Sequence, residues 1–169
     1  DANGRYVAVK TNPGSFYGIP LNGGDELRAI VDSLSHEVEH VRESDLRGKD
    51  EFAREYKGTG YAGLAARVLN IVEDHYIDAK RTDRFPGLRR SHAVFVRAQM
   101  KEAESVADMD RLNALSSGLW QVSHAGYAKG IREADDEVRE FLAGARRLLR
   151  RVESMDEQEQ RYDAARELT

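Results

Sequence analysis

The sequence of 169 residues contains no cysteine. Disulfide bonds and thiolate zinc sites are therefore excluded, and any bound metal must be held by histidine and carboxylate side chains. The chain also has no apolar run long enough to cross a bilayer, and no signal-peptide pattern opens it. We therefore expect a cytoplasmic protein that does not bind a membrane.

An excess of basic charge is also missing. The 26 lysines and arginines are outnumbered by 30 aspartates and glutamates, which gives a net charge of -4 and an isoelectric point near 5.8. Domains that bind nucleic acid usually carry a basic patch and a high isoelectric point. We therefore expect no nucleic-acid partner.

Apolar spacing predicts a mainly α fold (α+β) with one domain at residues 1–153 and a polar C-terminal helix or linker at 154–169. Helices are expected at about 25–44, 61–82, 88–106, 110–124 and 127–152, with a polar loop or short helix at 45–60. Residues 6–9 and 15–19 resemble strands on either side of the turn Asn12-Pro13-Gly14. They predict a small N-terminal β element.

The segment His36-Glu37-Val38-Glu39-His40 reads His-Glu-x-x-His. On a helix, residues four apart lie on one face, so both imidazoles can bind the same zinc ion. The glutamate after the first histidine can then accept a proton from zinc-bound water. We predict one zinc ion per chain, with His36 and His40 as ligands and Glu37 as the catalytic base.

The apolar residues of this helix lie within about 80° of one another on a helical wheel, opposite His36 and His40. They are Leu27, Ile30, Val31, Leu34, Val38 and Val41. We expect this apolar face to pack on the core while the other face holds the metal. In the alternative interpretation, both histidines are solvated on the polar face of a surface helix.

Catalytic zinc needs a third protein ligand and one open position. On the helix at 61–82, Glu73 lies among apolar residues, where an unpaired carboxylate is costly and a metal would be its partner. Asp74 lies on a charged face beside Arg67 and Arg81. Glu73 is therefore the first choice for the third ligand. Asp74 is the second choice, or a group that orients a ligand histidine. Alternatively, both carboxylates form only salt bridges within the helix.

Two residues beside the helix break at Gly126 are candidates for stabilising an oxyanion. His124 or Tyr127 can donate a hydrogen bond to the tetrahedral intermediate of a hydrolysis. Tyr61, beside Gly60, is a further candidate. In the alternative interpretation, His124 only stabilises a helix C-terminus through the helix dipole.

Three segments in this order carry a family resemblance. They are Leu34-Ser-His-Glu-Val-Glu-His40, Asn70-Ile-Val-Glu-Asp74 with Ile77 and Asp78, and Arg84-Phe-Pro-Gly87 with Arg89. Together they resemble the region preceding the von Willebrand factor A domain in proteins such as the cobaltochelatase T subunit and the nitric oxide reductase activator. In that group the second helix reads roughly Asn-x-x-Glu-Asp-x-x-Ile-Glu, and a Tyr-Pro-Gly-x-Arg turn follows. Here Asp78 stands in place of the final glutamate and Phe85 in place of the tyrosine.

This resemblance covers about residues 28–90 and implies a zincin-like fold. It implies zinc bound by His36, His40 and Glu73, with Glu37 as the base. It also implies work beside an AAA+ ATPase. The Asp-x-Ser-x-Ser pattern of a von Willebrand A domain is not in the sequence, and we expect that domain to follow Thr169 in a longer protein.

Two functions follow from these observations. The first is a zinc-dependent metallohydrolase, a metallopeptidase acting on a peptide or protein substrate. The second is a non-catalytic, metal-stabilised adaptor or assembly domain. It would bind a protein partner through the C-terminal helix or a missing C-terminal domain. A helical domain without metal is the remaining alternative.

Overall fold

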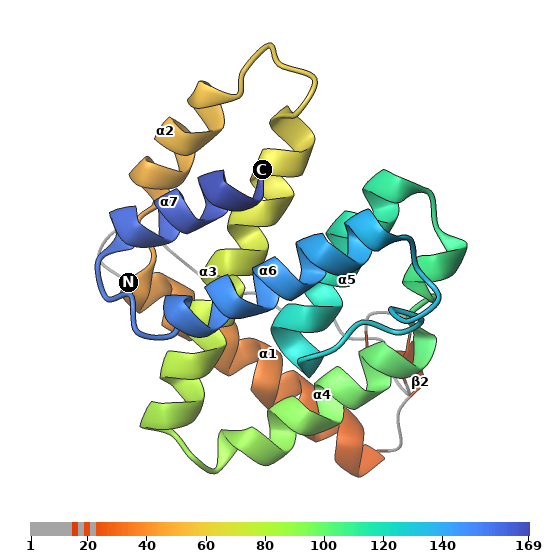
Figure 1. Ribbon diagram of the computed structural model, residues 1–169. Helices are drawn as coiled ribbons and strands as arrows, with labels where there is room; N and C mark the ends of the chain where they lie inside the picture. The colour runs from red at the N-terminus through yellow and green to blue at the C-terminus, as the bar shows by residue number, and fades with distance from the viewer. Residues whose placement is uncertain (1–14, 17–18, 21–22) are drawn as a thin grey trace. The chain divides into compact units, whose positions relative to one another are not determined.

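The computed structural model describes residues 15–16, 19–20 and 23–169 and is mainly helical (Figure 1). The elements are β1 (Ser15–Phe16), β2 (Ile19–Pro20), α1 (Gly23–Glu43), α2 (Leu46–Glu55), α3 (Ala62–Arg84), α4 (Leu88–Glu102), the 3₁₀ turn η1 (Val106–Asp108), α5 (Arg111–Ala125), α6 (Asp136–Val152) and α7 (Gln158–Leu168). β1 and β2 form an antiparallel pair, in which Phe16 is opposite Ile19. The expected strand at residues 6–9 lies outside the described residues.

Aspartates at their N-caps begin three of the helices. Asp45, Asp110 and Asp135 accept hydrogen bonds from the first free backbone N–H groups of α2, α5 and α6. These bonds satisfy donors that have no partner within the helix. Gly126 ends α5 with a φ of 77°, a left-handed conformation that glycine adopts without steric cost.

Contacts divide the chain into two compact units. The first comprises residues 1–44 and 77–103, and the second comprises residues 45–76 and 104–169. α3 is one continuous helix that passes from the second unit into the first at Ile77. This division differs from the expected boundary at residue 153.

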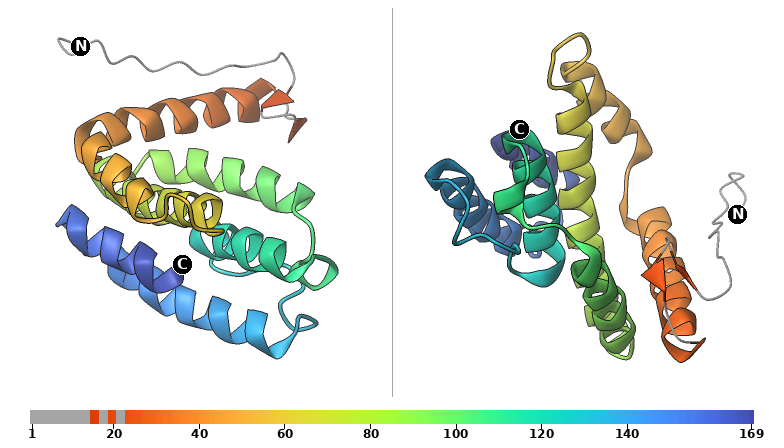
Figure 2. Two further views of the ribbon diagram at one scale, coloured as in Figure 1. Left: turned by 90° about the horizontal axis from the view of Figure 1, so that it is seen from above. Right: turned by 90° about the vertical axis from the view of Figure 1, so that its right-hand side faces the viewer.

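Polar groups dominate the packing of α1 in the first unit. α1 packs beside α4, as Figure 2 shows, and β1 contacts α1 while β2 contacts α4. Asp32 and Glu39 are buried on α1, and Arg81 from α3 is buried against them. The Arg81 guanidinium donates to the carboxylate of Asp32 over 2.6 Å and to the Ser35 hydroxyl over 2.7 Å. Arg84 forms ion pairs with Glu39 and Glu43.

The expected orientation of α1 is therefore wrong. Its polar face packs inside the unit, and its apolar face is exposed at Leu27, Val31, Leu34, Val38 and Val41. Buried Arg81 explains the reversal, because a buried guanidinium must be paired with carboxylates, and α1 supplies Asp32.

A conventional apolar core holds the second unit together. α5 packs on α6, and α6 contacts α7. The buried apolar side chains of these helices and of α3 include Val68, Val72, Leu119, Leu142, Leu149 and Val152. Gly118 allows close approach of α5 and α6, since a Cβ atom there would lie 2.6 Å from the Leu142 Cδ1 atom.

The two C-terminal helices can be compared with the sequence prediction. α6 begins at Asp136, because turns occupy the preceding residues from Gly126 onward. Residues 158–168 form α7, whose Arg161, Tyr162, Ala164, Ala165 and Leu168 are buried. Of the two forms expected for residues 154–169, a helix or a linker, the structure has the helix, and this helix belongs to the second unit. In the described part of the chain, no helix combines the length and apolar character needed to span a bilayer.

Candidate metal centre

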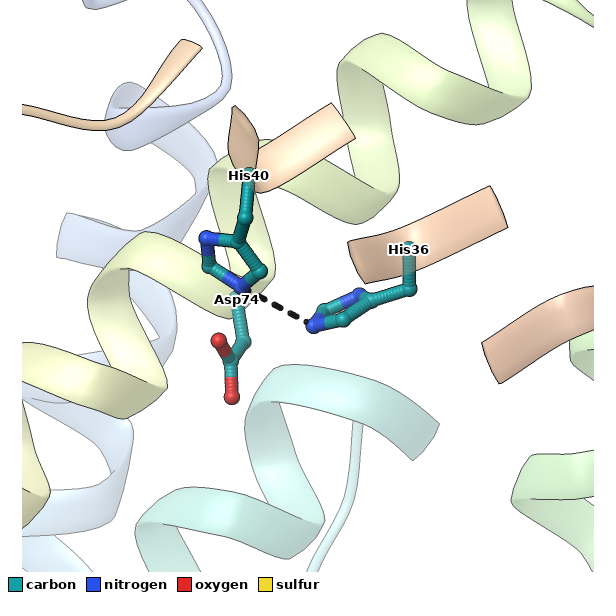
Figure 3. Close-up of side chains that lie close together, drawn as sticks. All are labelled: His36, His40 and Asp74. Atoms are coloured by element: carbon teal, nitrogen blue, oxygen red, sulfur yellow. Dashed lines mark hydrogen bonds between the residues drawn. The ribbon is translucent and has the colours of Figure 1, made fainter. Parts of the chain in front are cut away.

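His36 and His40 lie one turn apart on α1 and turn the same ring nitrogen toward each other. Their Nε2 atoms are 3.0 Å apart, and the two rings meet edge to face with centroids 4.6 Å apart (Figure 3). Both side chains are partly buried. The predicted helical face of the His-Glu-x-x-His motif is thus present, and its two Nε2 atoms converge on one point.

The other ring nitrogen of each histidine is held by a neighbour. His36 Nδ1 lies 2.9 Å from the carboxylate of Asp78, and His40 Nδ1 lies 2.9 Å from the hydroxyl of Ser44. A carboxylate can only accept, so His36 donates from Nδ1 and keeps its Nε2 lone pair for another group. Outer partners of this kind fix the tautomer and ring orientation of metal-binding histidines.

The spacing of the pair suits a tetrahedral metal ion. Two nitrogen ligands about 2.05 Å from zinc at tetrahedral angles are about 3.3 Å apart, a few tenths of an ångström from the observed separation. Without metal, the same spacing is an N–H···N hydrogen bond from His40 to His36. The Ser44 hydroxyl can donate or accept, so it can partner His40 in either tautomer.

Asp74 on α3 is the carboxylate that joins this pair. One ligand atom from each of His36, His40 and Asp74 lies within 4.8 Å of the other two (Figure 3). Asp74 precedes Asp78 by one turn of the continuous helix α3, and Asp78 is the residue that contacts His36. Asn70 donates to the second carboxylate oxygen of Asp74 over 2.7 Å.

Glu73, the first choice for the third ligand, has a different partner. It is fully buried in the second unit and accepts a hydrogen bond from Arg161 Nε over 2.8 Å. Burial among apolar residues was expected, and so was the need for a partner, but that partner is an arginine of α7. Asp74 belongs to the group of possible ligand atoms and Glu73 does not, so Asp74 is the carboxylate that we carry into the proposed function.

An ion-pair network surrounds Asp78. Arg81 donates to its carboxylate over 2.7 Å, and His92 Nε2 lies 3.7 Å from its other oxygen. Burial would raise the pKa of Asp78, but the hydrogen bond from His36 and the electrostatic interactions with His92, His36 and Arg81 together lower this pKa well below its usual range. Asp78 thus stays ionised and able to orient His36.

Asp78, Arg81 and Asp32 were not predicted from the sequence to have a role in the site. One observation in the sequence pointed to Asp78, since it lies in the second segment of the family resemblance. Arg81 follows Asp78 by three positions, which is the spacing of an ion pair on a helix. The pairing of Arg81 with Asp32 joins residues 49 positions apart, and nothing in the local sequence indicates it.

The remaining predicted site residues lie elsewhere. Glu37 is exposed on α1, directly after His36. His124 belongs to the second unit, where its ring stacks on Trp120 at 4.7 Å and its Nδ1 atom lies 2.6 Å from the Ser123 hydroxyl. Tyr127 and Tyr61 are exposed in the same unit. Oxyanion stabilisation by His124, Tyr127 or Tyr61 stays a prediction.

Three comparisons with known proteins found no match. No protein-family model, curated protein or solved structure matches the chain. The resemblance to the region before a von Willebrand factor A domain therefore stays an expectation, and the functional argument depends on the geometry of α1 and α3.

Proposed function

We propose that the chain is a zinc-dependent hydrolase of peptide bonds, with His36, His40 and Asp74 as the zinc ligands. The observation that carries this proposal is the convergence of two histidine Nε2 atoms while both Nδ1 atoms are held by neighbours. Histidines on a solvated surface have no need of such partners, whereas metal-binding histidines usually have them. A zincin-like arrangement with a small N-terminal β element belongs to the same proposal.

Zinc would supply a Lewis acid that polarises a carbonyl and lowers the pKa of water. The protein's own residues would do the rest. Asp78 would hold His36 in the tautomer whose Nε2 carries no proton, and Ser44 would do the same for His40. Glu37 would accept a proton during attack and return it to the leaving amine.

Metal content tests the ligand set. Protein purified without chelator or a histidine tag is analysed for zinc by mass spectrometry, and its zinc affinity is measured by competition with a chromophoric chelator. We expect about one zinc per chain, lost in His36→Ala, His40→Ala and Asp74→Asn. His124→Ala removes a histidine outside the ligand group and should keep the metal. Wild-type protein that binds no zinc when zinc is offered contradicts the proposal.

Turnover tests the role of Glu37. Glu37→Gln keeps the size of the side chain but removes the proton acceptor, so hydrolysis of a casein or peptide-library substrate should fall by about 10²-fold or more. Zinc content should stay that of the wild type. Hydrolysis that is unchanged in Glu37→Gln excludes this residue as the base.

A metal-stabilised adaptor is the second candidate function. The observation that favours it is the network of buried ion pairs around Asp32, Asp78 and Arg81, because this network gives the residues around the histidines a structural use. For an adaptor, zinc removal by chelator would lower the melting temperature, since binding energy adds to folding energy. Glu37→Gln would then match the wild type in every assay, with no hydrolysis in either protein.

A further inference from the structure

The outward face of α1 carries most of the exposed large apolar side chains of the described chain. Five of nine lie on this helix, with exposed fractions between 38% and 63%. They are Leu27, Val31, Leu34, Val38 and Val41. Isolated exposed apolar residues are ordinary, but a continuous row of them marks an interaction surface.

This surface faces outward because the opposite face of α1 is buried in ion pairs. Asp32 and Glu39 are buried in ion pairs with Arg81 and Arg84 on α3. A surface helix normally buries its apolar face and exposes its polar one. α1 does the reverse. If it turned its apolar row inward, the buried Arg81 would lose Asp32 and keep Asp78 as its carboxylate partner.

The spacing of the row identifies what can cover it. The intervals from Leu27 to Val41 are four, three, four and three residues, which is the heptad repeat of a coiled coil. Valine then occupies the a positions 31 and 38, leucine the d positions 27 and 34, and valine the last d position, 41. In parallel coiled coils, a β-branched residue at a with leucine at d favours two strands over three or four. The fitting partner is therefore another copy of this same helix.

Charge complementarity supports the same partner. In this heptad register Glu37 occupies a g position and Arg42 the following e position. In a parallel pair, g of one helix faces the next e of the other, so Glu37 would meet Arg42 of the second copy, twice by symmetry. Neither residue has an ion-pair partner among the described residues. An antiparallel pair places like positions opposite each other and loses this match.

We propose that α1 forms a parallel, in-register homodimer through Leu27, Val31, Leu34, Val38 and Val41. The seam covers 14 residue steps, about 21 Å of helix, so the dimer should dissociate on dilution. The proposal is independent of the metal, because His36 and His40 lie on the opposite face of α1. Glu37 has a role in both proposals, as the partner of Arg42 of the second copy and as the proton acceptor. The test of the dimer therefore measures mass and not turnover.

Mass as a function of concentration tests the seam. Sedimentation equilibrium of the full chain should give the dimer mass at high concentration and the monomer mass after dilution. Leu34→Lys places two ammonium groups in the seam and should give a monomer with unchanged helical circular dichroism. Leu112→Lys is the matched control, since Leu112 is 56% exposed on α5 and outside the seam. Wild-type protein that is monomeric throughout, or a Leu34→Lys protein that stays dimeric or unfolds, overturns the proposal.

A charge exchange tests the register. Arg42→Glu would place a glutamate opposite Glu37 in each of the two symmetric g–e contacts. The dissociation constant of the dimer should then rise at least several-fold. Adding Glu37→Arg restores opposite charges and should restore most of the affinity. If the double variant does not recover the dimer affinity, these two residues lie outside the contact.

Cysteine cross-linking tests the orientation, because an introduced thiol is the only thiol in the chain. In a parallel pair position 27 meets itself, within the Cα separation of about 4–7 Å that a disulfide needs. Leu27→Cys should therefore form a covalent dimer under mild oxidation, while Leu112→Cys should not. In an antiparallel pair, position 27 would lie toward the far end of the seam of the second copy and not beside itself. A Leu27→Cys protein that is dimeric in solution but does not cross-link refutes the parallel pair.

Discussion

Replacing Glu73 with glutamine separates the role of this residue in the fold from a role in metal binding. Glu73 and Arg161 are both buried, at 0% and 1% exposure, and their side chains are 2.8 Å apart. The substitution keeps the shape but removes the negative charge. Arg161 then keeps the carbonyls of Met155 and Asp156 and the face of the Tyr76 ring, but it loses the carboxylate of Glu73. Breaking a buried ion pair by removing one partner costs about 3–5 kcal/mol.

We therefore expect the free energy of unfolding to fall by about 3–5 kcal/mol in Glu73→Gln, with zinc binding unchanged. Urea denaturation followed by circular dichroism measures this free energy. An unchanged m-value shows that the substitution changed the stability of the fold and not the surface exposed on unfolding. Glu159→Gln is the matched control. It removes an exposed carboxylate that pairs with Arg166, and surface pairs contribute at most about 1 kcal/mol.

A double variant distinguishes loss of the pair from loss of Glu73 alone. With Arg161→Met added to Glu73→Gln, neither charge of this pair is left buried, so much of the lost stability should return. The reasoning is refuted if Glu73→Gln unfolds at the wild-type urea concentration while losing zinc. That result would return Glu73 to the position of third ligand and remove Asp74 from it.

Two further predictions concern packing and pH. Gly118→Val would press its added carbons on Leu142 and should destabilise the protein by about 1–3 kcal/mol in urea denaturation, whereas Gly144→Val, with only the far end of Arg147 nearby, should change it by less than about 0.5 kcal/mol. A destabilisation of equal size at both positions contradicts the close approach of α5 and α6. The lowered pKa of Asp78 gives stability that is complete above the ordinary value of 3.8 and lost as pH falls below it toward the folded-state pKa. Asp78→Asn should therefore lose less stability than the wild type in denaturation series run at decreasing acidic pH. An identical pH dependence would show that Asp78 is not the ionised group.

The helical periodicity of α1 was sufficient to predict its limits but not its orientation. The wheel correctly separated the apolar row from His36 and His40, since that separation depends only on residue spacing. Which face points inward depends on what approaches it. Here it is Arg81, a residue 49 positions from Asp32 in the sequence. No local pattern indicates such a pairing.

The partner of Glu73 could not be predicted from the local sequence either. The sequence correctly placed Glu73 in an apolar environment and correctly implied that it needs a partner. The partner is Arg161, 88 residues away on a segment whose polar composition predicted a polar helix or a linker outside the domain. α7 packs through a few small side chains, Ala164 and Ala165 among them, and through the stem of Arg161, so its burial leaves little trace in hydrophobicity.

The reversed orientation of α1 connects the two proposals without making either depend on the other. Because Arg81 needs Asp32, the polar face is inside, and this places His36 beside Asp78. The same requirement leaves Leu27, Val31, Leu34 and Val38 outside. Zinc would therefore stabilise the inner face while a second copy covers the outer one. Chelation should lower the melting temperature of the wild type and of Leu34→Lys by similar amounts, since the two sites share a helix but no side chain that carries metal. A dimer that dissociates whenever zinc is removed would show instead that the metal sets the orientation of α1.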